Sequence, residues 1–153
     1  MANEIRIRKG DSSDIGSVLQ IAKSLDDWFN EDGIKYIEQD LGFQKLIIAE
    51  TDCRTIGFLS FFTYEGIGYL GWLGVQKEYH GESVGEMLFL KFERIMHENE
   101  IDTLQVKTLG ESVDYPPYDR TRNYYFKMGF KEYRIEITDN PGCPEELILR
   151  KKI

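Results

Sequence analysis

Alternating and helical spacings of apolar residues divide the first quarter of the chain into three elements. Ile5 and Ile7 alternate with arginines, which predicts a half-buried first strand. Turn and helix-capping residues at positions 10–14 precede apolar residues at helical spacing from Ile15 to Leu25. A second short helix is predicted from Gly33 to Leu41. The chain therefore begins with a strand and two helices.

The middle of the chain changes to strand patterns. Strands are predicted at 45–50, 55–64 and 69–75, joined by turns at 51–54 and 65–68. Short turns between consecutive strands predict an antiparallel meander.

The second half alternates between helices and strands. The predicted elements are a long amphipathic helix opening near Gly81, a strand at 103–109, a helix at 119–128, and strands at 131–138 and 146–152. A meander joined to a strand–helix–strand crossover predicts a mixed sheet covered by helices.

Composition narrows the class of protein. With 153 residues, 41% of them apolar, we expect one globular domain spanning 1–153. The net charge of −8, without a concentrated basic patch, disfavours nucleic acid and suits an amine-bearing partner. No apolar run approaches membrane length, and the N-terminus carries no signal-peptide core. Cys53 and Cys143 fit no disulfide framework and no metal spacing, so we expect a cytoplasmic protein with free, non-nucleophilic thiols and no metal.

The stretch from Leu73 to Leu88 has the strongest chemical signal. A predicted strand enters a loop of small residues that opens the long helix, and unpaired N–H groups at a helix start bind phosphate or pyrophosphate. Gly81, Ser83 and Gly85 would let a ligand approach the backbone. The alternative is an ordinary helix start with convenient glycines.

The same loop also spells G-x-S-x-G, the nucleophile elbow of serine hydrolases. That elbow needs a later histidine from another loop. The later histidine here is His97, on the same predicted helix and roughly 20 Å from Ser83, and His80 comes too early. The hydrolase reading is therefore disfavoured.

A second anchor lies in 121–130, where a helix ends at a glycine and a strand follows. Taken alone, Tyr124 and Tyr125 in it would be core or surface aromatics. Taken together, the two anchors resemble the GNAT superfamily of N-acetyltransferases. In the loop, His80, Ser83 and Gly85 occupy the positions of the family's Q/R-x-x-G-x-G/A motif, of which Gly85 matches and the other two depart.

The second anchor resembles the family's F-Y-x-K-x-G-F segment. Tyr124 stands at the Phe position, and Tyr118 stands where an Asn often lies. The matching residues are Tyr125, Lys127, Gly129 and Phe130.

The resemblance implies a mixed α/β fold whose mostly antiparallel sheet of about seven strands is flanked by four helices. It also implies transfer of an acetyl group from acetyl-CoA to a primary amine of a small molecule or peptide, by direct attack on the thioester and without metal. Members of this family often dimerise, so a homodimer is among the expected assemblies. The residues expected to bind the co-substrate are Leu73, Val75, His80, Gly81, Glu82, Ser83, Val84 and Gly85.

The chemistry implied by the resemblance needs few groups. The amine must lose a proton, the developing oxyanion needs a donor, and the leaving thiolate needs a proton. Gly71 and Gly74 are compatible with a bulge in the strand before the loop, where the Val75 N–H is the expected donor. Tyr125 is the expected thiol acid, with Tyr124 as a packing residue.

The general base is left open by the sequence, because residues 69–75 contain no carboxylate. The candidates are Glu31, Asp114, Glu65 or a water relay, each of which is equally an ordinary surface acid. Trp28 and Phe29 lie where the family's acceptor pocket usually has its lid, although they could equally be core residues.

Two other classes of function stay open. A non-catalytic acyl-CoA sensor of the same fold would bind CoA without turnover. A structural protein that uses its acidic face would not bind CoA at all.

Overall fold

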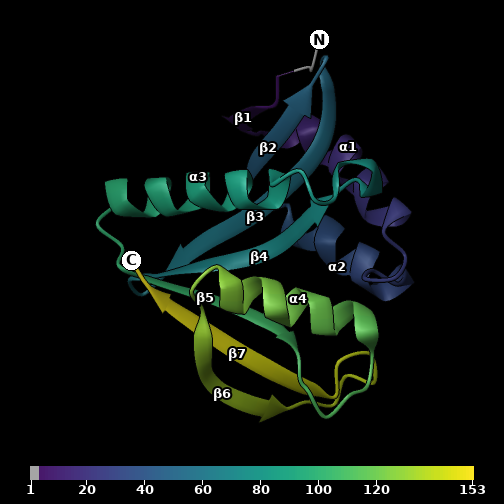
Figure 1. Cartoon of the computed structure of the whole chain (residues 1–153), viewed down its shortest axis with the longest axis vertical. Helices are drawn as coiled ribbons and strands as arrows, with labels where there is room; N and C mark the ends of the chain where they lie inside the picture. The colour runs from purple at the N-terminus through teal and green to yellow at the C-terminus, as the bar shows by residue number, and fades with distance from the viewer. Residues whose placement is uncertain (1–3) are drawn as a thin grey trace.

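One mixed sheet organises the chain in the computed structural model, which describes residues 4–153 (Figure 1). The strands are β1 (Arg6–Lys9), β2 (Lys45–Thr51), β3 (Arg54–Tyr64), β4 (Ile67–Val75), β5 (Thr103–Leu109), β6 (Lys131–Ile137) and β7 (Glu145–Lys152). The helices are α1 (Ile15–Ser24), α2 (Glu31–Asp40), α3 (Val84–Glu98) and α4 (Pro116–Lys127), with short 3₁₀ turns at Ser12–Asp14 and Lys77–Tyr79.

The strand order across the sheet is β1-β2-β3-β4-β5-β7-β6. Every neighbouring pair is antiparallel except β4 and β5, which the α3 crossover makes parallel. The predicted mixed, mostly antiparallel sheet with helices covering it is therefore confirmed.

The parallel pair at the centre of the sheet is short. Ile67–Tyr69 of β4 pair with Thr103–Gln105 of β5, and no further pairing between the two strands follows within residues 4–153. Since β4 continues to Val75 and β5 to Leu109, the two strands separate beyond this point. The separation opens the middle of the sheet.

The two faces of the sheet bury separate cores. On one face, α3 and α4 pack through residues such as Phe89, Phe92 and Tyr125. On the other face, α1 and α2 pack against β2 and β3 through residues such as Ile37 and Phe58. The opening between β4 and β5 therefore lies between two helical layers, as Figure 1 shows.

Three helix starts differ from the predicted ones, and the smallest difference is at α2, which begins at Glu31 and not at Gly33. α4 begins at Pro116 and not at 119, because prolines are tolerated in a helix's first turn, where N–H groups have no partner. α3 begins at Val84 and not near Gly81. Gly81 and Ser83 have φ values of 84° and 62°, which an α-helix cannot contain.

No helix among residues 4–153 is both long and apolar enough to cross a membrane.

Candidate active site

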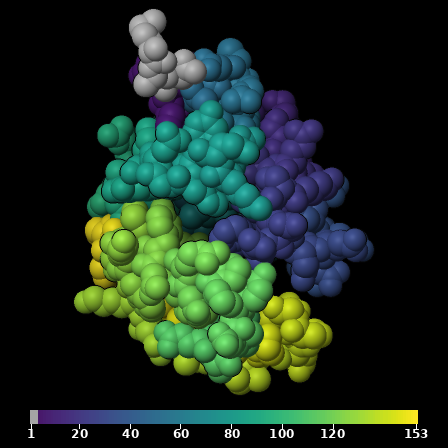
Figure 2. All heavy atoms as spheres, turned by 45° about the vertical axis from the view of Figure 1, so that its right-hand side comes forward, coloured from purple at the N-terminus to yellow at the C-terminus, as the bar shows by residue number. Residues whose placement is uncertain are grey.

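A cavity of about 1150 Å³ lies where the helical layers meet the separated strands. Its walls come from the α1–α2 linker and α2, from β4 and β5, from the loop before α3, from α4 and from the segment before β7. Figure 2 shows the surface hollowed between the teal α3 region, the green α4 and the blue-violet helices. Segments distant in sequence therefore share one cavity.

A bulge in β4 shapes the wall of this cavity. Leu59 pairs with Leu73 and Phe61 with Leu70, so Ser60 alone faces two residues of β4, Gly71 and Trp72. The Trp72 N–H donates to Ser60 Oγ at 2.9 Å, and that hydroxyl donates to Gln44 Oε1 at 2.6 Å.

A side chain at position 71 of this bulge would displace the end of the Gln44 side chain. A Cβ placed there would lie 2.0 Å from Gln44 Oε1. The expected bulge is present, and the Gln44 side chain packs directly over its backbone.

The backbone after the bulge presents donors to the opening. The Gln76 N–H donates to the Ile56 carbonyl at 2.8 Å. Hydrogen-bonded and non-hydrogen-bonded pairs alternate along an antiparallel ladder, so the N–H groups of Leu73 and Val75 point away from β3. The structure therefore places the Val75 N–H in the opening, together with a second donor, Leu73, directly after the bulge.

The loop before α3 adds a second set of donors. Among residues 4–153, the N–H groups of 83–86 have no intrahelical or capping partner, and the first helical bond runs from the Met87 N–H to the Ser83 carbonyl. His80 and Glu82 differ, since their N–H groups donate to the carbonyls of Lys77 and Tyr79.

His80 contributes its ring and not its N–H to the cavity wall. Its Nε2 lies 2.7 Å from the Val75 carbonyl oxygen, so the ring stands beside the end of β4. Glu82 does not line the cavity. The remaining residues expected to bind the co-substrate, Leu73, Val75, Gly81, Ser83, Val84 and Gly85, all line it.

Tyr124 reaches across from α4 to the first turn of α3. Its Oη is buried and has no hydrogen-bond partner among residues 4–153, and a Cβ placed on Gly85 would lie 3.0 Å from it. Burial, with a smaller effect from Glu86, raises the pKa of this phenol to about 12. The lack of a side chain at Gly85 therefore leaves room for the Tyr124 phenol.

Tyr125 occupies a different environment, although it also lines the cavity. Its side chain is 6% exposed, and its ring packs edge-on against Phe130 at 5.7 Å between centroids. Burial, followed by smaller effects of Tyr124 and Tyr118, raises the pKa of its phenol well above the ordinary value. Tyr125 therefore stays protonated at neutral pH.

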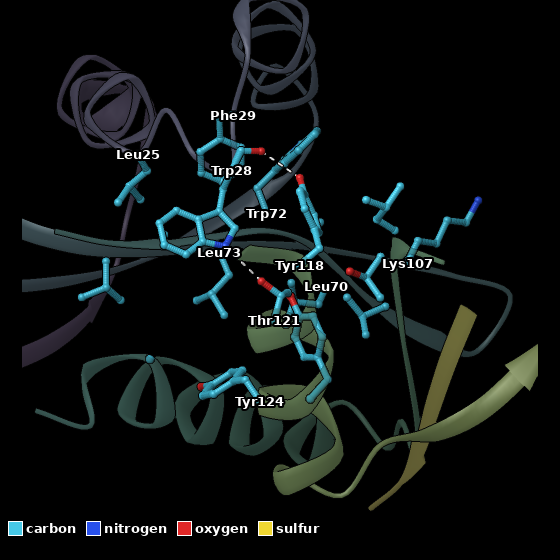
Figure 3. Close-up of a pocket in the computed structure, with 18 of the residues that line it drawn as sticks. Leu25, Trp28, Phe29, Leu70, Trp72, Leu73, Lys107, Tyr118, Thr121 and Tyr124 are labelled. Atoms are coloured by element: carbon cyan, nitrogen blue, oxygen red, sulfur yellow. Dashed lines mark hydrogen bonds between the residues drawn. The ribbon is translucent and has the colours of Figure 1, made fainter. Parts of the chain in front are cut away.

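Trp28 joins the α1–α2 linker to α4 across the cavity (Figure 3). Its Nε1 donates to Thr121 Oγ1 at 3.1 Å and to the Pro117 carbonyl at 3.2 Å. Tyr118 Oη donates in return to the Trp28 carbonyl at 2.8 Å. Both Trp28 and Phe29 line the cavity and also pack against the core beneath α1 and α2.

The acids proposed as bases are not brought to the site. Glu31, Glu65 and Asp114 do not line the cavity. Three other carboxylates, which the sequence analysis did not single out, line the cavity: Asp40, Glu86 and Glu146. Asp40 Oδ2 accepts from Trp72 Nε1 at 2.8 Å across a separation of 32 residues, and no local sequence pattern marks such a pair.

The two cysteines lie in different surroundings. Cys143 lines the cavity, and burial raises the pKa of its thiol, which disfavours the nucleophilic thiolate. Cys53 is exposed in the β2–β3 turn. Residues 4–153 contain no cluster of three or more His, Cys, Asp or Glu side chains able to hold a metal ion.

Comparison with known proteins identifies the class. A family model described as an acetyltransferase (GNAT) domain matches residues 42–132, which include the bulge, the loop and α4. The chain therefore belongs to the GNAT acetyltransferase family. No curated protein matches its sequence significantly.

Solved structures show the same fold over nearly the whole chain. A GNAT-family protein from Desulfovibrio desulfuricans superposes with a TM-score of 0.85 at 16% identity, covering 97% of this chain and 99% of that one. PaiA N-acetyltransferase from Thermoplasma acidophilum, solved with coenzyme A, gives 0.76 at 22% identity, covering 98% and 99%. Ribosomal-protein-S18-alanine N-acetyltransferase from Escherichia coli gives 0.78 at 14% identity, covering 98% and 94%.

Proposed function

We propose that this protein transfers an acetyl group from acetyl-CoA to a primary amine of a small molecule or peptide. The observation that carries the proposal is the presence of two sets of unpartnered backbone donors in one cavity. Leu73 and Val75 present one set at the bulge, and residues 83–86 present the other at the start of α3. One set suits a carbonyl oxygen and the other suits a pyrophosphate.

The residues at the start of α3 fit the pyrophosphate of CoA. The N–H groups of 83–86 carry the partial positive charge of a helix start, and 15 residues of helix stand behind them. Left-handed φ angles at Gly81 and Ser83 turn the chain so that these groups face the cavity.

Bound acetyl-CoA would supply an activated acetyl group as a thioester. The N–H groups of Leu73 and Val75 would orient its carbonyl oxygen and stabilise the negative charge that develops there. The amine nitrogen then forms a bond to the acetyl carbon while the carbon–sulfur bond breaks. Tyr125, kept protonated by burial, would donate a proton to sulfur.

The reaction must also remove two protons from the amine nitrogen and return one to Tyr125. An alkyl ammonium must lose one proton before attack and a second one after it. The nitrogen's first proton passes to solvent, and the second restores the Tyr125 phenol. The overall products are an amide, CoA and one proton.

A non-catalytic acyl-CoA sensor is the alternative, and the unpartnered donors alone would serve it equally. Tyr125 is compatible with catalysis, since its phenol lines the cavity and carries a proton that it could donate to the leaving sulfur.

The deciding experiment is a screen of amines with acetyl-CoA, read by release of the CoA thiol and by mass of the product. We expect thiol release that depends on both substrates and a product 42 Da heavier than the amine, the mass of an added acetyl group. Tight CoA binding without turnover of any amine would favour the sensor, and absence of CoA binding would refute both.

A further inference from the structure

The end of the cavity farthest from α3 differs in character from the rest. Its wall is largely aromatic and comes from the α1–α2 linker, α2 and the paired ends of β3 and β4. The aromatic lining residues here are Phe29, Tyr36, Phe43, Phe62, Tyr69 and Trp72. We call this set the aromatic wall.

The rings of the aromatic wall contact one another in pairs. Phe62 and Tyr69 stack at 4.8 Å across the strand pair, Phe43 packs edge-on against Phe62 at 5.5 Å, and Phe29 packs edge-on against Trp72 at 6.0 Å. Phe43 is nonetheless 62% exposed and Tyr36 48% exposed. Large aromatic side chains left open to solvent beside a cavity indicate a surface that a ligand covers.

One carboxylate stands within this wall. Asp40 is the last residue of α2, and its Oδ2 is oriented by Trp72 Nε1 at 2.8 Å. The last turn of α2 has no basic residue, and Asp40 has no ion-pair partner among residues 4–153. The partial negative charge of the helix end adds to that of the carboxylate.

Together, the aromatic wall and the Asp40 carboxylate favour a ligand that carries both a positive charge and an aromatic ring. An ammonium group facing Asp40 gains a charge-assisted hydrogen bond and the attraction of the surrounding ring faces. An anionic group placed beside Asp40 would be repelled by its carboxylate.

We propose that the acceptor is an arylalkylamine, which Asp40 binds through its ammonium group while the aromatic wall holds its ring. This proposal rests on the proposed acetyl transfer, because it names the amine that enters the same cavity. Trp72, adjacent to Leu73, ties the ammonium site to the donors of the bulge. Asp40 is thus a substrate-binding residue that sets specificity.

The test compares four amines with acetyl-CoA: 2-phenylethylamine, 2-cyclohexylethylamine, ethanolamine and spermidine. We expect kcat/KM for 2-phenylethylamine to exceed that for ethanolamine by at least about tenfold, with the cyclohexyl analogue between them. Higher efficiency with spermidine or ethanolamine would overturn the arylalkylamine proposal while leaving acetyl transfer intact.

The variant Asp40→Asn keeps the bond from Trp72 but removes the charge. We expect its KM for 2-phenylethylamine to rise at least about tenfold, with the KM for acetyl-CoA unchanged within about twofold. The matched control is Glu38→Gln, an exposed acid on the same helix outside the cavity. An Asp40→Asn enzyme with an unchanged amine KM would overturn the proposal.

Binding is measured separately so that the two proposals can fail independently. Calorimetry on the CoA-saturated protein should show 2-phenylethylamine binding that Asp40→Asn abolishes. That result without turnover would refute acetyl transfer but support the amine site. Turnover of other amines with no binding of 2-phenylethylamine would refute the amine site alone.

Discussion

The two ends of the cavity are built from different parts of the chain. At the α3 end, the groups that face a ligand are backbone N–H groups contributed by neighbouring residues, 83–86. At the α2 end, they are side chains such as Asp40 and Trp72, which meet across 32 residues. Backbone donors need a loop of a given shape and tolerate many side chains, so the His80 and Ser83 departures are compatible with the proposed CoA site. Side-chain sites change with each substitution, so this end is where we expect acceptors to be distinguished.

The largest expected effect tests the phenol between the two ends. Tyr125→Phe should lower kcat by about 10²–10⁴-fold, because a general acid is lost from the leaving sulfur, while CoA affinity stays within a few-fold. Burial raises the pKa of this phenol, so its proton is lost only as pH rises above the ordinary value near 10. The ratio of wild-type to variant rates should therefore be constant from about pH 6 to 9.

The assignment to Tyr125 has a direct control in its neighbour. Tyr124→Phe should keep kcat within a few-fold. A variant pair with these effects exchanged would move the acid to Tyr124, and full activity of Tyr125→Phe with a good acceptor would show that the thiolate leaves unassisted or through water.

The next largest effect concerns CoA binding at the start of α3, where the cavity presents backbone N–H groups. Gly85→Val should weaken CoA binding by at least about tenfold, because its branched side chain fills the space between the α3 start and Tyr124 Oη. Calorimetry provides the measurement. Gly16→Val is the control, since a Cβ at that exposed glycine in α1 meets nothing within 4 Å. Equal CoA affinity in Gly85→Val and the parent would place the pyrophosphate elsewhere.

A smaller effect concerns stability at the same end. Tyr124→Phe removes a buried hydroxyl that has no partner, so the ligand-free protein should gain about 1 kcal/mol in unfolding free energy. For a chain of this size, the melting temperature should rise by about 2–4 °C. Tyr64→Phe, at a tyrosine that is 62% exposed, should leave it unchanged. A loss of stability in Tyr124→Phe would show that the hydroxyl is satisfied.

The smallest effect concerns the loop backbone. Ser83 holds φ at 62°, which costs a residue with a side chain about 1 kcal/mol. Ser83→Gly removes that cost but adds chain entropy in the unfolded state, for a net gain of about 0.5 kcal/mol. Thermal unfolding measures it, and Ser17→Gly in the first turn of α1 should shift the melting temperature in the opposite direction.

The difference between the two ends of the cavity also explains which parts of the structure could be predicted from the sequence. The order of strands and helices follows from local periodicity, and the α3 loop follows from glycine and serine positions within a dozen residues. Asp40 could not be found in this way, because its partner Trp72 lies on another element and the sequence around Asp40 resembles any solvated helix end. The hydrogen bond from Trp28 to Thr121 could not be foreseen either, because the two residues are 93 positions apart in the sequence.

The separation of β4 and β5 has a consequence for kinetic order. A fully paired sheet is a continuous wall, and molecules on its two faces cannot react with each other. Here the wall is open, with the α3 start on the side of one helical layer and the aromatic wall on the side of the other. If acetyl-CoA and the amine bind as proposed, each enters from its own side of the sheet, and neither has to leave before the other arrives. Initial-rate plots against both substrates should therefore give intersecting lines, the pattern of a ternary complex, and not the parallel lines of a ping-pong reaction.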